Sequence, residues 1–438
     1  MGETETPKAL FPRLTGGPGG IGRSETARHQ RGRLEGAMVS AVAKHGYADT
    51  TVGELVGLAG VSKSTFYEHF PSKEECFLQT FETIVNEASS RVAMAYRSQG
   101  ALDDSPAGLE ESLAAAFTQF AEVVEEQAVP ATLVVVDSLT LGRAALDQRQ
   151  RGFDAFERMI HQSFRQAPGG SQPSDLAVRV MVAGVWTVVY RCLRAGCPEE
   201  LGDHLEPIVG WALSYRNPIT LPPMPPPASQ NGEADLEAAG WNEPPDSPGS
   251  RESLSQRDRI VRAAAQVAAE TGYKNLTIPA ISATAGTSNQ TFYEHFESKE
   301  EAFLAAFEEL SRRGLSATWA AAATQTEWAA IVEAGMRGLL EHIVEEPLFA
   351  KLAFFELPAA GAVALDQADA AIRRFTGFLD PRALPPDIAP LPPVVVEALG
   401  GGAWQAIQHE IAVGDLDGLP DFAPELTAVM LTPFLQGR

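Results

Sequence analysis

The sequence predicts an all-α protein made of two tandem units, and three observations lead to this prediction. At 438 residues the chain is too long for one ordinary hydrophobic core. Its apolar residues recur at helical spacing, without the sustained alternation that marks strands. The block TFYEHF occurs twice, at 65–70 and 291–296, which are 226 positions apart. Each half is therefore expected to hold a small domain of short helices and a larger helical domain.

Composition places the chain among folded globular proteins, with 45% apolar and 21% charged residues. The formal net charge of −23 argues against bulk attraction to nucleic acid or anionic membranes, but it leaves room for a local basic face. The three cysteines are odd in number and lack metal-ligand spacing, which predicts reduced thiols, no metal and no cofactor. No stretch approaches the ~18 apolar residues of a membrane span, so a cytoplasmic protein without a membrane partner is expected.

Two Gly/Pro-rich segments divide the chain. Residues 1–22 are predicted to be a disordered tail, and 217–250, rich in proline and acidic residues, to be a linker between the halves. Gly17, Gly19 and Gly22 formally match G-x-G-x-x-G, but no strand precedes them, so no dinucleotide site is predicted. The remaining boundaries are 23–75 and 251–301 for the small domains, and 76–216 and 302–438 for the larger ones.

The two halves resemble each other along most of their length. Segments 46–81 and 272–307 align without gaps and share 19 of 36 residues. Further along, Leu146-Asp147-Gln148 corresponds to Leu365-Asp366-Gln367, and Gly184-x-Trp186 to Gly402-x-Trp404. The whole unit is therefore predicted to be duplicated, which makes the chain a tandem fusion.

Each small domain begins with a helix, expected at about 28–45 and 254–271. These helices are closed by Gly46 and Gly272, whose position calls for positive φ. A short helix follows in each half, capped by Thr51 or Thr277.

In the first copy Glu54 is expected to complete a capping box with Thr51, whereas the second copy has Pro279 and Ala280 in that region. After a turn at Gly60 or Gly286, Ser62 or Ser288 caps another helix. Two short helices around a glycine turn predict a helix-turn-helix, whose second helix would enter a major groove.

The segments GVSKSTFYEHFPSKEECF and GTSNQTFYEHFESKEEAF resemble the DNA-binding signature of the TetR family of transcriptional regulators. The resemblance covers about 50 residues in each half; beyond them only length and helical texture match. It implies a dimer that pairs two heads with a palindromic operator. It also implies a ligand between the helices of the larger domain that shifts the fourth helix, predicted from Ser72 to about Tyr96 and from Ser298 to about Ala322.

Two groups of residues are predicted to contact DNA. The first turns of the recognition helices, Lys63-Ser64-Thr65 and Asn289-Gln290-Thr291, are placed to read bases, since lysine suits guanine while asparagine and glutamine suit adenine. Tyrosine, histidine and lysine further along resemble the family's phosphate contacts. A solvated lysine is the alternative for Lys63, and a solvated helix face for the arginines. The full predicted set is Arg28, Arg31, Thr51, Ser62, Lys63, Ser64, Thr65, Tyr67, His69, Lys73, Arg257, Thr277, Ser288, Asn289, Gln290, Thr291, Tyr293, His295 and Lys299.

Charge counting supports this surface only modestly. Residues 23–73 hold seven Lys/Arg against five Asp/Glu, a net +2, and residues 251–299 hold six against five, a net +1. Weakly basic heads on an acidic protein predict moderate affinity for DNA and a clear salt dependence.

The larger domains are predicted to hold apolar effector pockets, although most of their aromatic residues are expected to be core. Asp137 and Glu356 occupy comparable places in apolar runs, where an ionised carboxylate needs a partner, so each is either paired structurally or orients a ligand. The candidate pocket residues are Phe117, Phe120, Asp137, Trp186 and Tyr190 in the first half, and Phe354, Phe355, Glu356, Trp404 and His409 in the second.

The sequence thus predicts a DNA-binding, ligand-responsive repressor that acts as a single-chain pseudo-dimer on an operator with two unlike half-sites. Its partners would be double-stranded DNA and a small apolar effector, with a homodimer of two chains as the other arrangement. No nucleophile elbow, phosphate loop or H-E-x-x-H motif indicates an enzyme. The alternative function is an effector-binding or protein-interaction module in which one or both heads no longer read DNA.

Overall fold

The computed structural model describes residues 23–100, 106–166, 172–217, 219, 255–414 and 416–436. Every regular element within these ranges is helical, which confirms the predicted all-α class. The predicted tail 1–22 and nearly all of the predicted linker 217–250 lie outside the described residues.

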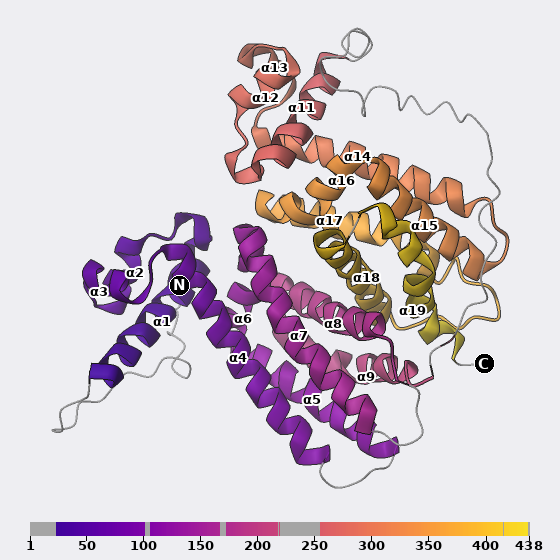
Figure 1. The fold of residues 1–438 in the computed structure, drawn as a ribbon, viewed down its shortest axis with the longest axis horizontal. Helices are drawn as coiled ribbons and strands as arrows, with labels where there is room; N and C mark the ends of the chain where they lie inside the picture. The colour runs from indigo at the N-terminus through magenta and orange to yellow at the C-terminus, as the bar shows by residue number, and fades with distance from the viewer. Residues whose placement is uncertain are drawn as a thin grey trace. The chain divides into compact units, whose positions relative to one another are not determined.

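The same succession of helices occurs twice (Figure 1). We call residues 23–216 the first repeat and 251–438 the second repeat. The first repeat contains α1 (Arg23–Asp49), α2 (Val52–Ala59), α3 (Lys63–His69), α4 (Lys73–Gly100), α5 (Pro106–Glu126), α6 (Ala128–Val135), α7 (Arg143–Gln166), α8 (Asp175–Ala195) and α9 (Leu205–Ser214). The second contains α11 (Gln256–Thr271), α12 (Ile278–Ala285), α13 (Asn289–His295), α14 (Lys299–Ala322), α15 (Trp328–Glu345), α16 (Pro347–Lys351), α17 (Ala362–Phe375), α18 (Pro393–Val413) and α19 (Ala423–Leu435).

Short irregular helices join these elements and recur at equivalent places. A 3₁₀ helix, Asp137–Leu141, follows α6, and a π-helix, Leu352–Glu356, continues α16. Other 3₁₀ helices span Pro198–His204, Tyr273–Asn275, Leu357–Ala360, Gly377–Leu379 and Leu416–Phe422. The starts of α6 and α16, and of α7 and α17, are both 219 residues apart, and those of α8 and α18 are 218 apart. The two tandem units therefore share one helical plan.

Glycines end the first helices where the sequence predicts. Gly46 has φ 77° and Gly272 has φ 82°, so both adopt the positive φ that residues with side chains rarely do. Helix α1 is longer than predicted: it begins at Arg23, and one helical turn continues after the kink at Gly46. Helix α11 begins one residue after its cap, Ser255, whose hydroxyl accepts from the Asp258 N–H at 3.2 Å.

The contacts of the chain define two compact units, one of residues 1–172 and 185–213 and the other of residues 173–184 and 214–438. The boundary cuts through α8, so the first half of that helix belongs to the second unit. Within the second unit Arg179 on α8 pairs with Glu410 on α18 at 3.3 Å, and the Tyr215 hydroxyl donates to the Val429 carbonyl at 2.9 Å. The predicted boundary at 217–250 therefore separates the sequence repeats but not the compact units.

Helix α8 is long and apolar enough to cross a membrane by composition alone. About 72% of its most apolar window is buried within the protein. A buried core helix meets the same criterion, and this one lines the interior of the larger domain through Val188 and Val189.

Candidate nucleic-acid interface and effector cavity

Serine caps fix the start of each recognition helix. The Ser62 hydroxyl accepts from the Thr65 N–H at 3.0 Å, and the Ser288 hydroxyl accepts from the Thr291 N–H at the same distance. The threonine hydroxyls lie 2.9 and 3.0 Å from these serines. Since all four hydroxyls close the cap, they hold the first turn in place in both repeats.

The residues predicted to read bases are exposed on the first turns of α3 and α13. Lys63 and Ser64 in the first repeat, and Asn289 and Gln290 in the second, all face solvent. The opposite side of each helix is anchored in the core by Phe66 or Phe292, which are completely buried. The two recognition helices therefore have the same frame but present different side chains.

Tyrosine hydroxyls extend the exposed surface along each recognition helix. Tyr67 is 57% exposed and Tyr293 60%, and each ring packs edge-on against the buried phenylalanine before it. A large aromatic side chain held outward in this way can donate to a phosphate oxygen, as predicted. His69 and His295 are half-buried, and the His69 Nε2 lies 3.3 Å from the Gln30 amide oxygen.

Arginines of the first helices stack on the ends of the recognition helices. The Arg31 guanidinium lies 5.4 Å from the Phe70 ring centroid, and that of Arg257 lies 5.1 Å from the Phe296 ring. Arg31 also pairs with Glu35 and donates to Gln79. These contacts hold both arginines beside the recognition helix, while Arg28, on the preceding turn, is exposed.

Lys73 and Lys299 require a correction, because their ammonium groups point into the protein. Lys73 donates to the carbonyls of Tyr47 at 2.8 Å and Thr50 at 2.9 Å, and lies 4.1 Å from the Tyr47 ring centroid. Lys299 donates to the Leu276 carbonyl at 2.9 Å. These lysines therefore clamp the loop between the first two helices, and we remove them from the predicted phosphate contacts.

The predicted capping box of α2 is half formed. The Thr51 hydroxyl accepts from the Glu54 N–H at 3.2 Å, but the Glu54 carboxylate lies 2.9 Å from His45 Nε2 instead of returning to the cap. In the second repeat Thr277 accepts from the Ala280 N–H at 3.4 Å, and Pro279 is accommodated in the first turn. Thr51 and Thr277 thus orient the helix that precedes each recognition helix.

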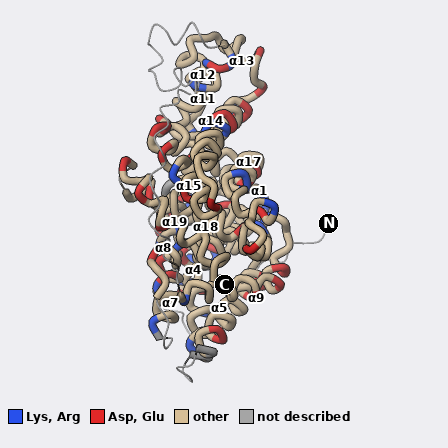
Figure 2. Tube along the Cα trace, turned by 90° about the vertical axis from the view of Figure 1, so that its right-hand side faces the viewer, with Lys and Arg blue, Asp and Glu red and all other residues tan. Residues whose placement is uncertain are grey.

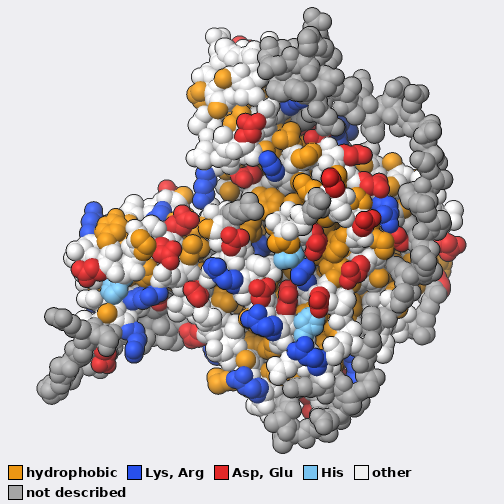
Figure 3. All heavy atoms as spheres, viewed as in Figure 1, with side chains coloured by type: hydrophobic (Ala, Val, Ile, Leu, Met, Phe, Trp, Pro, Cys, Tyr) orange, Lys and Arg blue, Asp and Glu red, His pale blue; other side chains and the backbone are white. Residues whose placement is uncertain are grey.

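Basic and acidic side chains are mixed on the surface. Figure 2 shows Lys/Arg and Asp/Glu positions interspersed along the helices rather than gathered in one block. The small domain of α1–α3, on the left in Figure 3, displays basic, acidic and hydrophobic side chains together. Recognition by this surface would depend on specific contacts in the groove more than on bulk charge.

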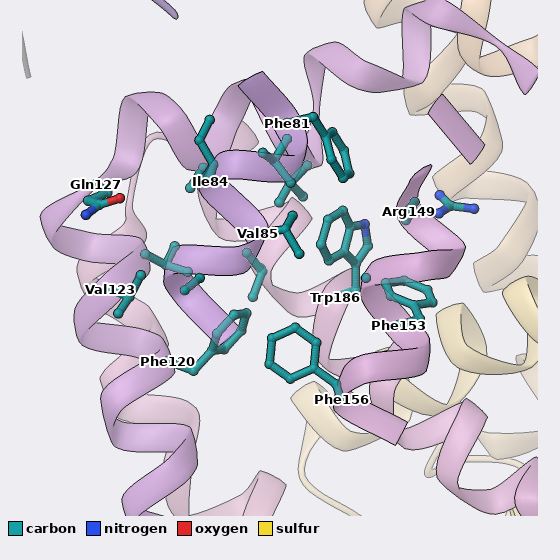
Figure 4. A pocket seen from close by; sticks show the side chains of 17 residues that line it. Phe81, Ile84, Val85, Phe120, Val123, Gln127, Arg149, Phe153, Phe156 and Trp186 are labelled. Carbon is teal, nitrogen blue, oxygen red and sulfur yellow. The ribbon is translucent and has the colours of Figure 1, made fainter. Parts of the chain in front are cut away.

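An apolar cavity of about 50 Å³ lies within the first unit. Figure 4 shows Phe120, Phe156 and Trp186 facing a common space beside Val85, while the polar ends of Gln127 and Arg149 point away from it. The lining residues come from α4, α5, α6, α7 and α8, and they are Phe81, Ile84, Val85, Ala88, Phe120, Val123, Val124, Gln127, Ala131, Val134, Val135, Arg149, Gly152, Phe153, Phe156, Trp186 and Val189.

The predicted pocket residues of the first repeat are only partly brought together. Phe120 and Trp186 line this cavity, and Phe117 lines a smaller one of about 20 Å³ that Phe120 also borders. Tyr190 lies outside both cavities, and its hydroxyl accepts from Arg194 at 3.1 Å. Asp137 also lies outside, in the 3₁₀ helix that follows α6.

In the second repeat the predicted pocket residues pack on one another. Phe354 is fully buried and stacks on Trp404, with ring centroids 4.1 Å apart and an angle of 22° between planes. Phe355 and His409 are half-buried and line neither of the two cavities of the first unit.

Glu356 is a structural partner and does not orient a ligand. Its carboxylate accepts from the main-chain N–H of Tyr273 at 2.7 Å, which ties the larger domain to the end of α11. Asp137, at the comparable place, has no hydrogen bond or ion pair to its carboxylate among the described contacts. Burial raises the pKa of Asp137 to about 6. The two carboxylates, predicted as alternatives of one kind, therefore differ in environment.

Sequence reasoning missed most of the cavity lining. Phe81, Ile84 and Val85 on α4, and Phe153 and Phe156 on α7, recur at the three- to four-residue spacing of a buried helix face. That spacing indicates burial, but it does not tell a face that borders a cavity from one that is packed.

Comparisons with known proteins agree with the geometry of the small domains. Residues 37–80 and 260–306 match the family model "Bacterial regulatory proteins, tetR family". The HTH-type transcriptional regulator CymR of Pseudomonas putida is 33% identical over 69 residues, 16% of this chain and 34% of that protein. The match thus spans about a third of that relative's length.

Solved structures with a similar fold were also found. The fatty acid degradation regulator FadR from Bacillus halodurans has a TM-score of 0.34 and 17% identity, covering 40% of this chain and 95% of that one. A putative transcriptional regulator from Pseudomonas aeruginosa PAO1 has a TM-score of 0.35 and 15% identity, covering 44% and 97%. The matches to residues 37–80 and 260–306 identify both small domains as helix-turn-helix domains of the tetR family of bacterial regulatory proteins.

Proposed function

We propose that the protein is a ligand-responsive transcriptional repressor, formed by tandem fusion, that binds an operator with two unlike half-sites. The observation that carries this proposal is the pair of recognition helices. They share caps, buried anchors and stacked arginines, yet expose Lys63-Ser64 in one repeat and Asn289-Gln290 in the other. Lysine can donate to guanine O6 and N7, whereas asparagine and glutamine suit adenine. Regulation of this kind takes place at the chromosome, which puts the protein in the cytoplasm and requires no enzymatic activity.

The pairing of the repeats within one chain is part of the proposal. A contact in the second unit supports it: α8, from the first repeat, pairs through Arg179 with Glu410 of α18. At Gly402 on α18 a side-chain Cβ would lie 2.4 Å from the Val180 carbonyl, so the helix backbones approach closely there. Helices α8 and α18 are equivalent in the two repeats, as an interface with pseudo-two-fold symmetry requires.

Helix α4 is the proposed route from effector to DNA. Its residues Phe81, Ile84, Val85 and Ala88 form one wall of the cavity. Its first residue, Lys73, clamps the loop that ends α1. A molecule that pushes this wall outward would therefore move α4 together with the helix-turn-helix domain, and would change the affinity for the operator by favouring one position of that domain.

The test is selection of bound duplexes from a randomised library at near-physiological salt, with the stoichiometry recorded. We expect two different half-sites about one helical turn apart, bound by one chain. A perfect palindrome bound by two chains would refute the intramolecular pseudo-dimer. No enriched sequence would refute DNA reading and favour the effector-binding or protein-interaction module.

A matched variant sharpens this test. Lys63→Asn combined with Ser64→Gln gives the first recognition helix the exposed pair of the second, on the same capped frame. The selected site should then become symmetric, with both half-sites resembling the one assigned to α13. An unchanged site would show that these positions do not read bases.

A further inference from the structure

We infer that effector binding is confined to the first repeat, whose cavity takes a neutral hydrocarbon or single-ring aromatic molecule, because the second repeat fills the equivalent space with its own side chains. The inference rests on the proposed ligand-responsive function and deepens it, since it gives that function one sensing site per chain. It concerns cavity positions that differ between two otherwise parallel helical plans.

The register of the comparison is set by the helices themselves. Helices α4 and α14 start 226 residues apart, at Lys73 and Lys299. The junction of α5 with α6 at Gln127, and that of α15 with α16 at Glu346, are 219 residues apart. These two spacings assign each residue of the cavity wall a partner in the second repeat.

The first substitution places a ring where the cavity has an aliphatic side chain. Val135 lines the cavity near the end of α6, and its equivalent is Phe354. The Phe354 ring stacks on Trp404, the equivalent of the cavity residue Trp186. In the first repeat the tryptophan instead packs edge-on against Phe153, with centroids 5.3 Å apart.

The second substitution introduces an imidazole on α15. Val123 lines the cavity, and its equivalent is His342, which is only 7% exposed. Ala88, on the facing wall, corresponds to Gly314, where a Cβ would lie 3.0 Å from His342 Cδ2. The glycine therefore leaves the room that the histidine ring occupies.

A chain of aromatic rings completes the filling. Phe349 lies between His342 and Phe354, with centroid distances of 5.6 and 6.5 Å. Phe375 lies 6.3 Å from Trp404 and corresponds to the cavity residue Phe156. The walls common to both repeats thus enclose a free space in the first and ring atoms in the second.

The chemistry of the cavity defines the ligand. Aliphatic and aromatic carbons make its walls, and the polar ends of Gln127 and Arg149 are turned outward (Figure 4). Gln127 donates to Glu87 at 3.4 Å, away from this space. A hydroxyl or carboxylate buried there would lose its hydrogen bonds to water without replacement, so a neutral apolar molecule is favoured.

Size links occupancy to movement. A benzene ring fills an engineered cavity of roughly 150 Å³, whereas the present volume is about 50 Å³. A single-ring molecule can therefore enter only if the walls separate, and α4 forms one of them. Binding and displacement of α4 would be one event.

The experiment is titration of the full chain with fluorobenzene, followed by ¹⁹F NMR. We expect one molecule bound per chain, with 4-fluorophenol and 4-fluorobenzoate at least ~10-fold weaker. Val135→Phe should abolish this binding, whereas Val129→Phe, at a position 44% exposed on the same helix, should leave it unchanged. Phe354→Val combined with His342→Val should create a second site, which keeps the inference testable if Val135→Phe fails to fold.

Each outcome decides a separate point. Two molecules bound to the unaltered chain, or one molecule that survives Val135→Phe in a folded protein, would overturn the assignment to the first repeat. Equal or stronger binding of 4-fluorobenzoate would overturn the ligand class. Fluorobenzene bound as inferred, but without any change in affinity for the selected operator, would leave the cavity assignment intact and refute the ligand-responsive function.

Discussion

Replacing Asp137 by asparagine should stabilise the first unit at neutral pH. The carboxyl group lies at the start of the 3₁₀ helix after α6, without a partner among the described contacts, and burial raises its pKa from 3.8 to about 6. That difference corresponds to roughly 3 kcal/mol by which ionisation destabilises the folded state. Because the asparagine amide also loses some hydrogen bonding to water on burial, we expect a net gain of about 1–2 kcal/mol.

The pH dependence identifies the cause. Between pH 3.8 and about 6 the folded state retains a proton that the unfolded state has released, so the stability of the unaltered protein falls as pH rises through this window. Asparagine does not titrate. The two proteins should therefore be closest in stability near pH 3.8, and the gain of the variant should reach its full size above pH 6.

The assay is urea unfolding at several pH values, read by pulsed hydrogen exchange on peptides from α6, so that the two units are measured separately. Glu356→Gln is the matched control in the second repeat. It weakens the charge-assisted hydrogen bond to the Tyr273 N–H, so it should destabilise its unit by about 1 kcal/mol at neutral pH. A less stable Asp137→Asn variant, or a difference independent of pH, would show that the Asp137 carboxylate is stabilised in the folded state.

Three further predictions concern packing, protonation and DNA contacts. Gly338→Ala should cost about 1–3 kcal/mol in thermal unfolding, since its Cβ would lie 2.7 Å from the Ala321 Cβ, whereas Gly57→Ala, with nothing within 4 Å, should be neutral or stabilising. Burial lowers the pKa of His342 to about 4, so stability should fall by up to ~3 kcal/mol as pH falls from 6.5 to 4, and His342→Leu should remove this dependence. Lys73→Met should destabilise the first helix-turn-helix domain without changing the salt dependence of DNA binding by the folded fraction.

The helix-turn-helix domains could be predicted in detail because local rules determine them. Ser62 and Thr51 cap their helices as the sequence indicates, and Gly46 and Gly60 adopt positive φ where a helix must end. Each of these features depends on a few neighbouring residues. Lys73 was wrongly placed because its position in the motif says nothing about the carbonyls of a loop 23 to 26 residues earlier.

The cavity could not be predicted in the same way. Trp186 and Trp404 stand in equivalent sequence contexts, yet only Trp186 borders a free space, because Val135 in one repeat is replaced by Phe354 in the other. Both side chains are apolar and fit the same helical pattern. The difference depends on which side chains meet across three or four helices, and such contacts follow from tertiary packing.

The duplication separates what the fold requires from what each repeat is free to change. Lysine clamps at Lys73 and Lys299 and arginine stacks at Arg31 and Arg257 are repeated, since each helix-turn-helix domain needs them to hold its recognition helix. The exposed first turns of those helices and the interior of the larger domains differ, because neither determines the helical frame. A repeat that loses its cavity gains aromatic packing and keeps its recognition helix. A fused chain can therefore hold one domain that senses an apolar molecule beside one that is permanently packed, which two copies of an identical subunit cannot do.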